Sequence, residues 1–308
     1  MIMIFESLTP TTHADCGKGV WALGMATSTD GENWTIESTE VVLPNPGGAG
    51  GVPYACVAAH PSAVFTTAGA NGKVQVYWKA ETYNLSGGAA ACSAPDDFCE
   101  YTGIGRATIN LNASGGLNNV SIQTSSVVDF PQGRYGGYPR IVQVDSTFYL
   151  TVQLYPDIHT FYSTSASTFP LGNSNLAFDA DSSDWDTFGW VTDEFMSPAM
   201  ICDDELPDEW ALWLGSKDTN FGVTQSGGIG RATSDDFSTW FLSGTASHTW
   251  SGDDTMRHFD AIKLDTDEYL LYYSEKDTNG ESTIHLLATD QNFDLSTDTP
   301  VGKVCTGN

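Results

Sequence analysis

Short apolar segments alternate with polar turns along the whole chain. One recurring unit consists of two segments joined by a tight turn. The first segment is Ala-Thr-Ser-like, the turn is rich in Ser, Asp, Gly and Asn, and the second segment begins with an aromatic residue. Its clearest copies are residues 230–240 and 24–34, and weaker ones are 105–110, 161–165 and 287–290. This pattern is typical of strands joined in hairpins. No long run has 3.6-residue apolar periodicity, so we expect few helices.

Two further segments precede each of these hairpins. The nearer one is almost continuously apolar, with copies at 74–81, 148–152, 210–218 and 269–277 and a shorter one at 2–7. The farther one is led by proline in His60-Pro61, Tyr138-Pro139 and Ser197-Pro198, and its last copy begins at His258. Proline is tolerated at the first residue of a strand, which needs no ladder partner for its nitrogen. Four antiparallel strands, repeated every roughly 45–75 residues, predict the blades of a β-propeller.

The repeats number five, so the fold class predicted is an all-β, five-bladed propeller of four-stranded antiparallel blades. We expect one domain over residues 1–308, with blades at about 1–50, 55–130, 134–190, 191–248 and 254–298. Blade one begins at its second strand and has no inner strand of its own. Either residues 301–305 complete it and close the ring, or the chain is truncated; an unfilled position would leave an exposed ladder edge, which favours closure.

Acidic residues outnumber basic ones, with 39 Asp+Glu against 12 Lys+Arg and a formal net charge of −27. Such a chain repels phosphate backbones and anionic lipids, so we expect no nucleic-acid and no membrane partner. No apolar run approaches the ~20 residues of a membrane span. The acidity suits either a protein living in salty water or solubility alone, and we expect a monomer.

Six cysteines and four Asn-X-Ser/Thr sites suggest an oxidising, secreted or extracellular setting. Cys92 and Cys99 bracket a short loop and are the expected disulfide pair. The pairing of the other four stays open: Cys16, Cys56, Cys202 and Cys305. Residues 1–5 are too short for a signal peptide and lack a basic region, so a secreted form would have lost its leader.

The turns at 28–34 and 233–240, together with the proline-led strands, resemble the five-bladed β-propeller glycoside hydrolases, a clan that includes arabinanases, xylosidases, invertases and levansucrases. The resemblance implies a poly- or oligosaccharide in an axial funnel, cleaved between carboxylates of the inner strands of blades one to three. The standard positions are not matched. His60 stands where the resemblance implies Asp before proline, Gly137 or Tyr138 where it implies Glu, and the blade-one strand is not found.

The resemblance also implies a channel-lining histidine on the inner strand of the last blade, the position of His258. A calcium or sodium ion could then lie in the channel with His258 as its ligand. The alternative, a histidine hydrogen-bonded among the inner strands, stays open, and no cofactor is required.

Carboxylates near the inner strands are the candidates for acid–base chemistry. Asp260 lies two residues past His258 and therefore points to the same side of its strand. Asp193 and Glu194 precede the inner strand of blade four. All three could instead be solvated or hydrogen-bonded acids. The expected substrate-binding residues are His60, Tyr138, Arg140, Ser197, Arg257 and His258.

Two functions from different classes fit these residues. One is a glycoside hydrolase-like, carbohydrate-active propeller, and the other is a glycan-binding or structural propeller that has lost the chemistry. Whether the chain is an enzyme stays open at this point. Two carboxylates within ~5–10 Å of each other would separate the two hypotheses, since that is the spacing that glycosidase mechanisms use.

Overall fold

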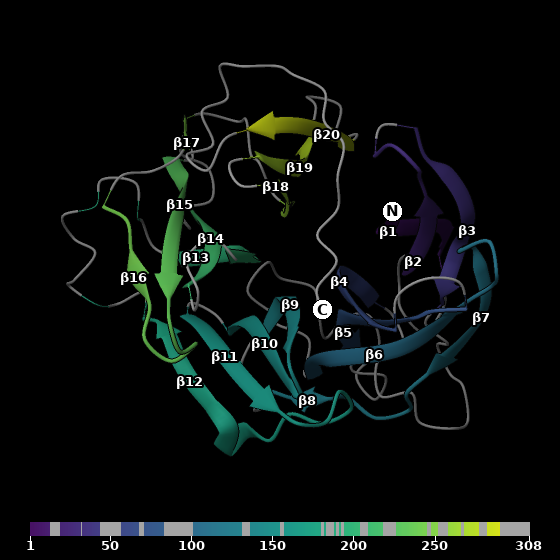
Figure 1. Cartoon of the computed structure of the whole chain (residues 1–308), viewed down its shortest axis with the longest axis horizontal. Helices are drawn as coiled ribbons and strands as arrows, with labels where there is room; N and C mark the ends of the chain where they lie inside the picture. The colour runs from purple at the N-terminus through teal and green to yellow at the C-terminus, as the bar shows by residue number, and fades with distance from the viewer. Residues whose placement is uncertain are drawn as a thin grey trace. The chain divides into compact units, whose positions relative to one another are not determined.

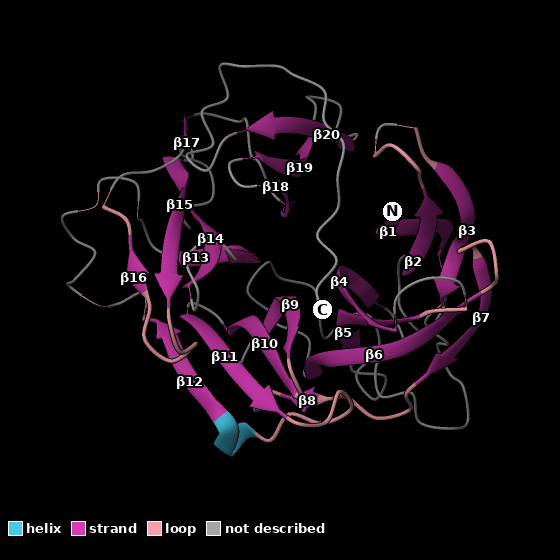
Figure 2. Cartoon of the chain, viewed as in Figure 1, coloured by secondary structure: helices cyan, strands magenta, loops and turns pink. Residues whose placement is uncertain are grey.

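The computed structural model describes a chain made almost entirely of β-strands (Figure 2). The only helix among the described residues is the short 3-10 helix η2 (Leu171–Asn173). Among these residues, none forms a helix with the length and apolar character that a membrane crossing requires. The structure describes residues 1–12, 19–31, 33–43, 57–67, 71–82, 101–130, 136–154, 157–179, 182, 188, 191, 194–203, 209–217, 226–244, 248–251, 258–265, 268–276 and 282–289.

The chain divides into two compact units, which are described separately. The first unit comprises Met1–Leu154 and Phe161–Ser174, and the second comprises Tyr155–Thr160 and Asn175–Asn308. The prediction of a single domain over residues 1–308 stays a prediction.

An eight-stranded sheet contains the first two predicted blades (Figure 1). Its main path is β1-β2-β4-β5-β6-β7, with β3 paired to β2 and β8 paired to β6. Its described strands pair antiparallel, except for one parallel bridge between Trp21 of β2 and Val57 of β4. The strands are β1 (Ile2–Thr12), β2 (Gly19–Thr27), β3 (Thr35–Val42), β4 (Val57–Thr67), β5 (Lys73–Thr82), β6 (Tyr101–Leu111), β7 (Leu117–Ile122) and β8 (Val128–Asp129).

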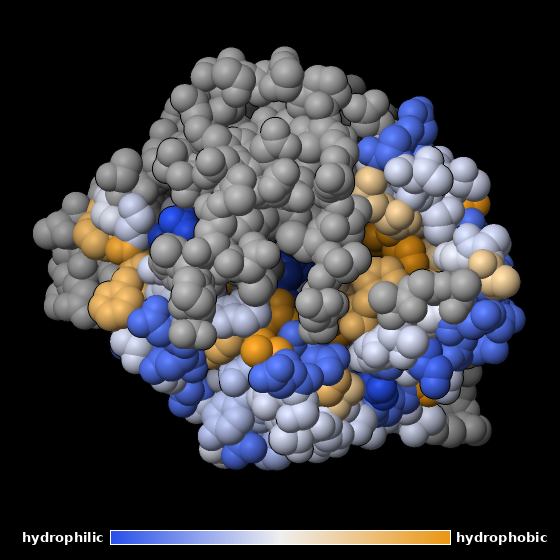
Figure 3. Space-filling model, viewed as in Figure 1, coloured by the Kyte–Doolittle hydropathy of each residue, from blue (hydrophilic) through white to orange (hydrophobic). Residues whose placement is uncertain are grey.

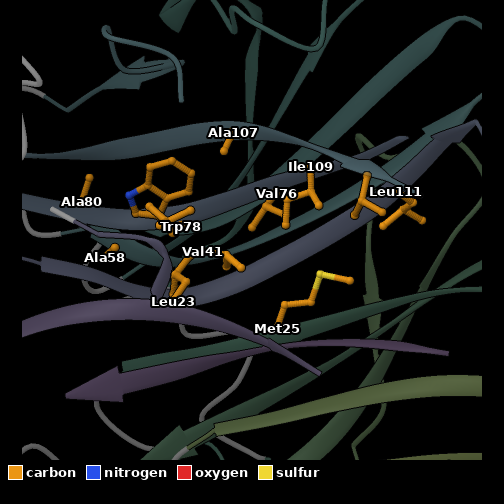
Figure 4. Packing of buried hydrophobic residues seen from close by; sticks show 12 residues of the cluster. Leu23, Met25, Val41, Ala58, Val76, Trp78, Ala80, Ala107, Ile109 and Leu111 are labelled. Atoms are coloured by element: carbon orange, nitrogen blue, oxygen red, sulfur yellow. The ribbon is translucent and has the colours of Figure 1, made fainter. Parts of the chain in front are cut away.

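One hydrophobic core joins these two repeats (Figure 4). Leu23 and Met25 of β2 pack in the same cluster as Val76 and Trp78 of β5 and Ile109 of β6. Burial of such side chains is the main favourable term in folding, at about 25 cal/mol per Å² of apolar surface. The described apolar side chains of the first repeat are therefore buried together with those of the second.

Repeats one and two also share a close contact between an aromatic ring and a glycine. Phe5 of β1 lies opposite Gly24 of β2, and Trp78 of β5 lies opposite Gly105 of β6. In both places the ring occupies the space where a Cβ on the glycine would stand. The match makes β1 the equivalent of β5, the second strand of its repeat, as the sequence predicted.

The third predicted blade is a four-stranded sheet in the order β12-β11-β10-β9. Its strands are β9 (Gly136–Val144), β10 (Thr147–Leu154), β11 (Asp157–Ser163) and β12 (Ser174–Phe178). Buried residues in β9 and β10, among them Ile141 and Leu150, join the second hydrophobic cluster of the first unit. Tyr77 belongs to the same cluster, where burial raises its pKa to about 12 against the opposing effect of Arg106.

The fourth and fifth predicted blades lie in the second unit. One sheet has the order β13-β14-β15-β16, with β17 paired to β15, and the next has the order β18-β19-β20. Phe178 packs against Phe195 and Trp240, with ring centroids 5.6 and 6.1 Å apart. The strands are β13 (Glu194–Asp203), β14 (Glu209–Lys217), β15 (Ser226–Ser234), β16 (Phe241–Leu242), β17 (His248–Ser251), β18 (His258–Asp265), β19 (Glu268–Lys276) and β20 (Ser282–Thr289).

The recurring turns are held by their own side chains. Ser28 Oγ accepts hydrogen bonds from the backbone of Asp30 and Gly31, and Asp30 accepts one from the backbone of Asn33. In the later copy, Asp236 accepts 2.8 Å bonds from the backbone N–H groups of Ser238 and Thr239. These bonds lower the pKa of Asp236 to about 2. Such local bonds are the reason why Ser and Asp favour turns.

The surface that Figure 3 shows is mixed in character. Hydrophilic side chains cover much of its described part, and hydrophobic ones form separate patches between them. Large hydrophobic residues with high exposure are scattered over β3, β4, β7, β11, β12 and β16, and include Ile36, Phe65 and Phe241. Isolated exposed residues of this kind are normal for folded proteins and need no partner.

The all-β prediction is confirmed, and the predicted strands recur in the described sheets. Blade one contains β1, β2 and β3, and its inner strand is absent among the described residues. The expected disulfide between Cys92 and Cys99 and the closing segment at 301–305 lie outside the described residues. So do the four other cysteines, except Cys202, whose backbone belongs to β13.

Candidate functional site

The proline-led strands share an irregularity at the same place. The register shifts between Ala59 and Ser62 in β4, and between Met196 and Ala199 in β13. In the β9–β10 pair it shifts across the segment that contains Tyr138 and Pro139. In each case the irregularity spans an X-Pro pair, which fits the missing backbone donor of proline.

Two of the residues before proline have unusual backbone angles. The φ of His60 is 52° and that of Tyr138 is 49°. Non-glycine residues seldom adopt positive φ, and the cost is of order 1–3 kcal/mol each. Two such residues at equivalent positions of neighbouring repeats mark a place where the chain holds particular side chains in position. Strain of this kind concentrates at binding and catalytic sites.

The two strained residues stack on each other. The rings of His60 and Tyr138 are nearly parallel, at an interplanar angle of 6°, and their centroids are 3.9 Å apart. Both residues are half-buried. The hydroxyl of Ser62 also accepts a 3.2 Å bond from the backbone of Ile141, which ties β4 to β9. The stack is therefore a fixed, partly exposed aromatic surface.

A carboxylate lies directly beside the stack. The backbone N–H of His60 donates a hydrogen bond of 2.6 Å to Oε1 of Glu6, which comes from β1. Burial raises the pKa of the Glu6 carboxyl, while the bond from His60 and the charges of Lys79 and Arg140 act in the opposite direction. Desolvation prevails because it disfavours the charged form of a carboxyl more than these neighbours favour it.

The two cations beside Glu6 come from β5 and β9. Lys79 is 5% exposed and Arg140 is 8% exposed. Nη1 of Arg140 donates hydrogen bonds to the backbone oxygens of Pro61 and Pro139, at 3.2 and 3.1 Å. A Cβ on Gly137 would stand 2.9 Å from Cδ of Lys79 and 3.2 Å from Nδ1 of His60. The absence of a side chain at Gly137 thus leaves room for the Lys79 stem.

We refer to Glu6, His60, Lys79, Tyr138 and Arg140 as the Glu6 cluster. All five lie in the first unit. Together they supply a flat aromatic surface, two cations, of which Arg140 donates hydrogen bonds to backbone oxygens, and a carboxyl with an elevated pKa. Sites that bind polar organic ligands combine apolar faces with a few fixed polar groups of this kind.

Three of the sequence-predicted binding residues are brought together in this cluster: His60, Tyr138 and Arg140. Glu6 and Lys79 were not among the predicted site residues. The sequence places candidate carboxylates near inner strands, whereas Glu6 lies on the second strand of its repeat. The repeat does mark both positions. Phe5 and Trp78 are equivalent aromatic residues that each lie opposite a glycine. Glu6 directly follows the first of them and Lys79 directly follows the second.

The other predicted site residues lie in the second unit or outside the described residues. Asp260 is an exposed residue of β18, opposite Tyr272 of β19. Glu194 and Ser197 belong to β13 and His258 to β18, but their side chains are not among those described. Asp193 and Arg257 are outside the described residues altogether. Their predicted roles stay predictions.

The described side chains contain no group of three or more His, Cys, Asp or Glu that could hold a metal ion. The side chain of His258 is not among them, so the predicted cation beside it stays a prediction.

Neither protein-family models nor curated proteins match this sequence. Solved structures do. An exo-1,5-α-L-arabinanase from a bovine ruminal metagenomic library is 14% identical with a TM-score of 0.57, over 86% of this chain and 85% of its own. The endo-arabinanase of Bacillus licheniformis is also 14% identical with a TM-score of 0.55, over 92% of each chain. The chain has the fold of the β-propeller glycoside hydrolases.

A third neighbour of this β-propeller is a larger enzyme. The β-fructofuranosidase of Bombyx mori is 11% identical with a TM-score of 0.56, and the match covers 92% of this chain and 57% of the enzyme. The resemblance drawn from the turns and proline-led strands is therefore confirmed at the level of the fold, as is the five-bladed propeller class. Closure of the ring through residues 301–305 stays a prediction.

Proposed function

We propose that this protein is a carbohydrate-active propeller that binds an oligosaccharide at the Glu6 cluster. The observation that carries the proposal is the stack of His60 and Tyr138, held by two strained X-Pro positions beside Glu6. The neighbouring structures support a sugar ligand. One of them, the arabinofuranosidase of Podospora anserina, is described in complex with cellotriose, and the Bombyx mori enzyme in complex with sucrose.

The chemistry of the cluster suits a sugar. An aromatic face packs against the apolar C–H face of a pyranose or furanose ring, while its edge leaves the hydroxyls for polar partners. Glu6 can accept hydrogen bonds from hydroxyls when ionised and donate one when protonated, and Lys79 can only donate. The cluster thus offers both kinds of partner that a hydroxyl needs.

Hydrolysis is a second candidate function, favoured by the elevated pKa of Glu6. A carboxyl with a raised pKa keeps its proton to a higher pH than usual, which favours protonation of the leaving oxygen of a glycoside. The reaction also needs a second carboxylate, about 5–10 Å away, as base or nucleophile. The charges that act on Glu6 among the described residues are both positive, so binding is the function that the described part of the site supports best.

A panel of arabino-, xylo-, fructo-, gluco- and galacto-oligosaccharides, neutral and acidic, tests the proposal by calorimetry. We expect at least one to bind, and Tyr138→Ala to weaken it roughly 2- to 13-fold, since an aromatic stack contributes about 0.5–1.5 kcal/mol. Tyr162→Ala is the matched control, because Tyr162 is an exposed tyrosine of β11. Equal affinity in the Tyr138 and Tyr162 variants, both folded by circular dichroism, would refute the proposed site.

Chromogenic glycosides, assayed with and without calcium, separate binding from hydrolysis. We expect turnover only if a second carboxylate completes the site. Turnover that Glu6→Gln leaves unchanged would exclude Glu6 as the proton donor.

A further inference from the structure

Two residues directly before β5 form a pair whose side chain and backbone can react with each other. Asn71 is followed by Gly72, and β5 begins at Lys73. No other asparagine in the part of the chain that the structure describes is followed by glycine. We propose that Asn71 is a deamidation site, at which the backbone nitrogen of Gly72 attacks the asparagine side chain and converts it to aspartate and isoaspartate. The proposal is independent of the sugar site.

The reaction needs only these two residues and water. The nitrogen of Gly72 loses its proton to hydroxide and forms a bond to Cγ of Asn71. The bond from Cγ to Nδ2 breaks, and Nδ2 takes up a proton and leaves as ammonia, so a cyclic imide remains. Water then opens the imide at either carbonyl and gives aspartate or isoaspartate, with no change of oxidation state. Glycine favours the attack because no side chain shields its nitrogen and its backbone is the least restricted.

The structure leaves the carboxamide of Asn71 at the surface. Asn71 is exposed and its φ is 57°, in the left-handed region that asparagine tolerates better than most residues. Its N–H donates a 3.1 Å bond to the carbonyl of Asn112, and the carbonyl of Gly72 accepts a 2.9 Å bond from the N–H of Leu111. Neither bond uses the side chain of Asn71 or the nitrogen of Gly72, which are the two groups that react.

Two other turn asparagines are held by their side chains. Oδ1 of Asn112 accepts hydrogen bonds from two backbone N–H groups of its own turn, at 2.9 and 3.0 Å. Nδ2 of Asn33 donates a 2.9 Å bond to Asp30. Each of these asparagines is also followed by a residue that has a side chain. A tethered carboxamide turns less readily towards the next nitrogen, so we expect Asn71 to convert before both of them.

Isoaspartate at this position would change the local backbone. The chain then runs through the former side-chain Cβ, which lengthens it between the N–H of Asn71 and the carbonyl of Gly72. The bonds to Asn112 and from Leu111 bracket that stretch, so they cannot both keep their geometry. We therefore expect the Leu111 amide to lose protection from hydrogen exchange. Either product also adds a negative charge to a chain whose formal net charge is −27.

Peptide mapping by mass spectrometry tests the site on the full chain, aged at neutral and at mildly alkaline pH beside a sample unfolded in urea. We expect the peptide with residues 71–72 to gain the mass of an amide-to-acid exchange, faster at the higher pH. Because Gly72 is buried, the folded protein should convert more slowly than the unfolded chain. Labelling with a protein isoaspartate methyltransferase should identify the same peptide. Asn279, which also precedes a glycine, lies outside the described residues and is followed on its own peptide.

Two variants sharpen the test. Asn71→Gln should abolish the labelling of this peptide. Gly72→Ala should slow the conversion severalfold, and alanine suits the backbone there because the φ of Gly72 is not positive. A folded protein in which residues 71–72 stay intact while the unfolded chain converts would overturn the proposal. Earlier conversion at Asn33 or Asn112, or an unchanged rate in a folded Gly72→Ala variant, would also overturn it. If that variant does not fold, the mapping of the natural protein still decides.

Discussion

Gly105→Ala tests the packing that joins the first two repeats. A Cβ at this position would stand 2.5 Å from Nε1 and 2.6 Å from Cζ2 of Trp78. Ordinary contacts of a Cβ are 3.4–4 Å, so the indole must move by about 1 Å. Trp78 is 4% exposed and belongs to the shared core, where close packing leaves little room for such a shift. Overpacking of this kind costs about 1–3 kcal/mol.

The assay is equilibrium unfolding in urea, followed by tryptophan fluorescence and circular dichroism. With a urea dependence of about 1–3 kcal/mol per molar, the loss lowers the midpoint by roughly 0.5–2 M. Gly24→Ala should behave similarly, because its Cβ would stand 2.5 Å from an edge carbon of Phe5. Gly172→Ala is the control, since no atom lies within 4 Å of its Cβ. A Gly105 variant as stable as the Gly172 variant would refute the equivalence of the two aromatic–glycine contacts.

Three further predictions concern carboxyl groups. The pKa of Asp236 is lowered to about 2, chiefly by the hydrogen bond from the backbone of Thr239. The ionised carboxylate therefore stabilises the fold above about pH 3.8, and this stabilisation is lost as the pH falls towards 2. Unfolding measured over this range should show that loss in the natural protein and a flatter profile in Asp236→Asn; the effect is small because the group is exposed. The pKa of Glu6 is raised, so ionisation is harder in the folded state and stability falls as the pH rises above about 4.5. Glu6→Gln should remove that fall, and an unaltered profile would contradict a raised pKa for Glu6. Asp260→Asn should abolish any glycosidase activity. It should not lower the melting temperature, because Asp260 is exposed on β18. Unchanged turnover in this variant would show that Asp260 takes no part in catalysis.

The strands and turns could be predicted from the sequence because their signals are local. The segment from Ser28 to Trp34 folds back on itself through bonds between residues two or three apart, and the copy at 234–240 does the same. The X-Pro pairs were equally readable, since proline interrupts a ladder wherever it occurs. Repetition of these local signals was enough to predict the propeller fold.

The chemistry of the site could not be predicted in the same way. The bond between His60 and Glu6 joins residues 54 positions apart, and no local pattern marks it. Charged residues also end other second strands, at 216–218 and 275–277, so the charge of Lys79 does not single it out in the sequence. The elevated pKa of Glu6 arises from burial, which depends on how several strands come together and not on any one of them.

The parallel bridge between Trp21 and Val57 has a consequence for cooperativity. Repeats one and two contribute apolar side chains to the same buried cluster. We therefore expect them to unfold together and not one at a time. Amide hydrogen exchange should therefore report a single opening event for β2, β4, β5 and β6. A fragment ending after β3 would separate four members of that cluster from the other eight. Recombination with the remainder should therefore be needed for either piece to become protease-resistant.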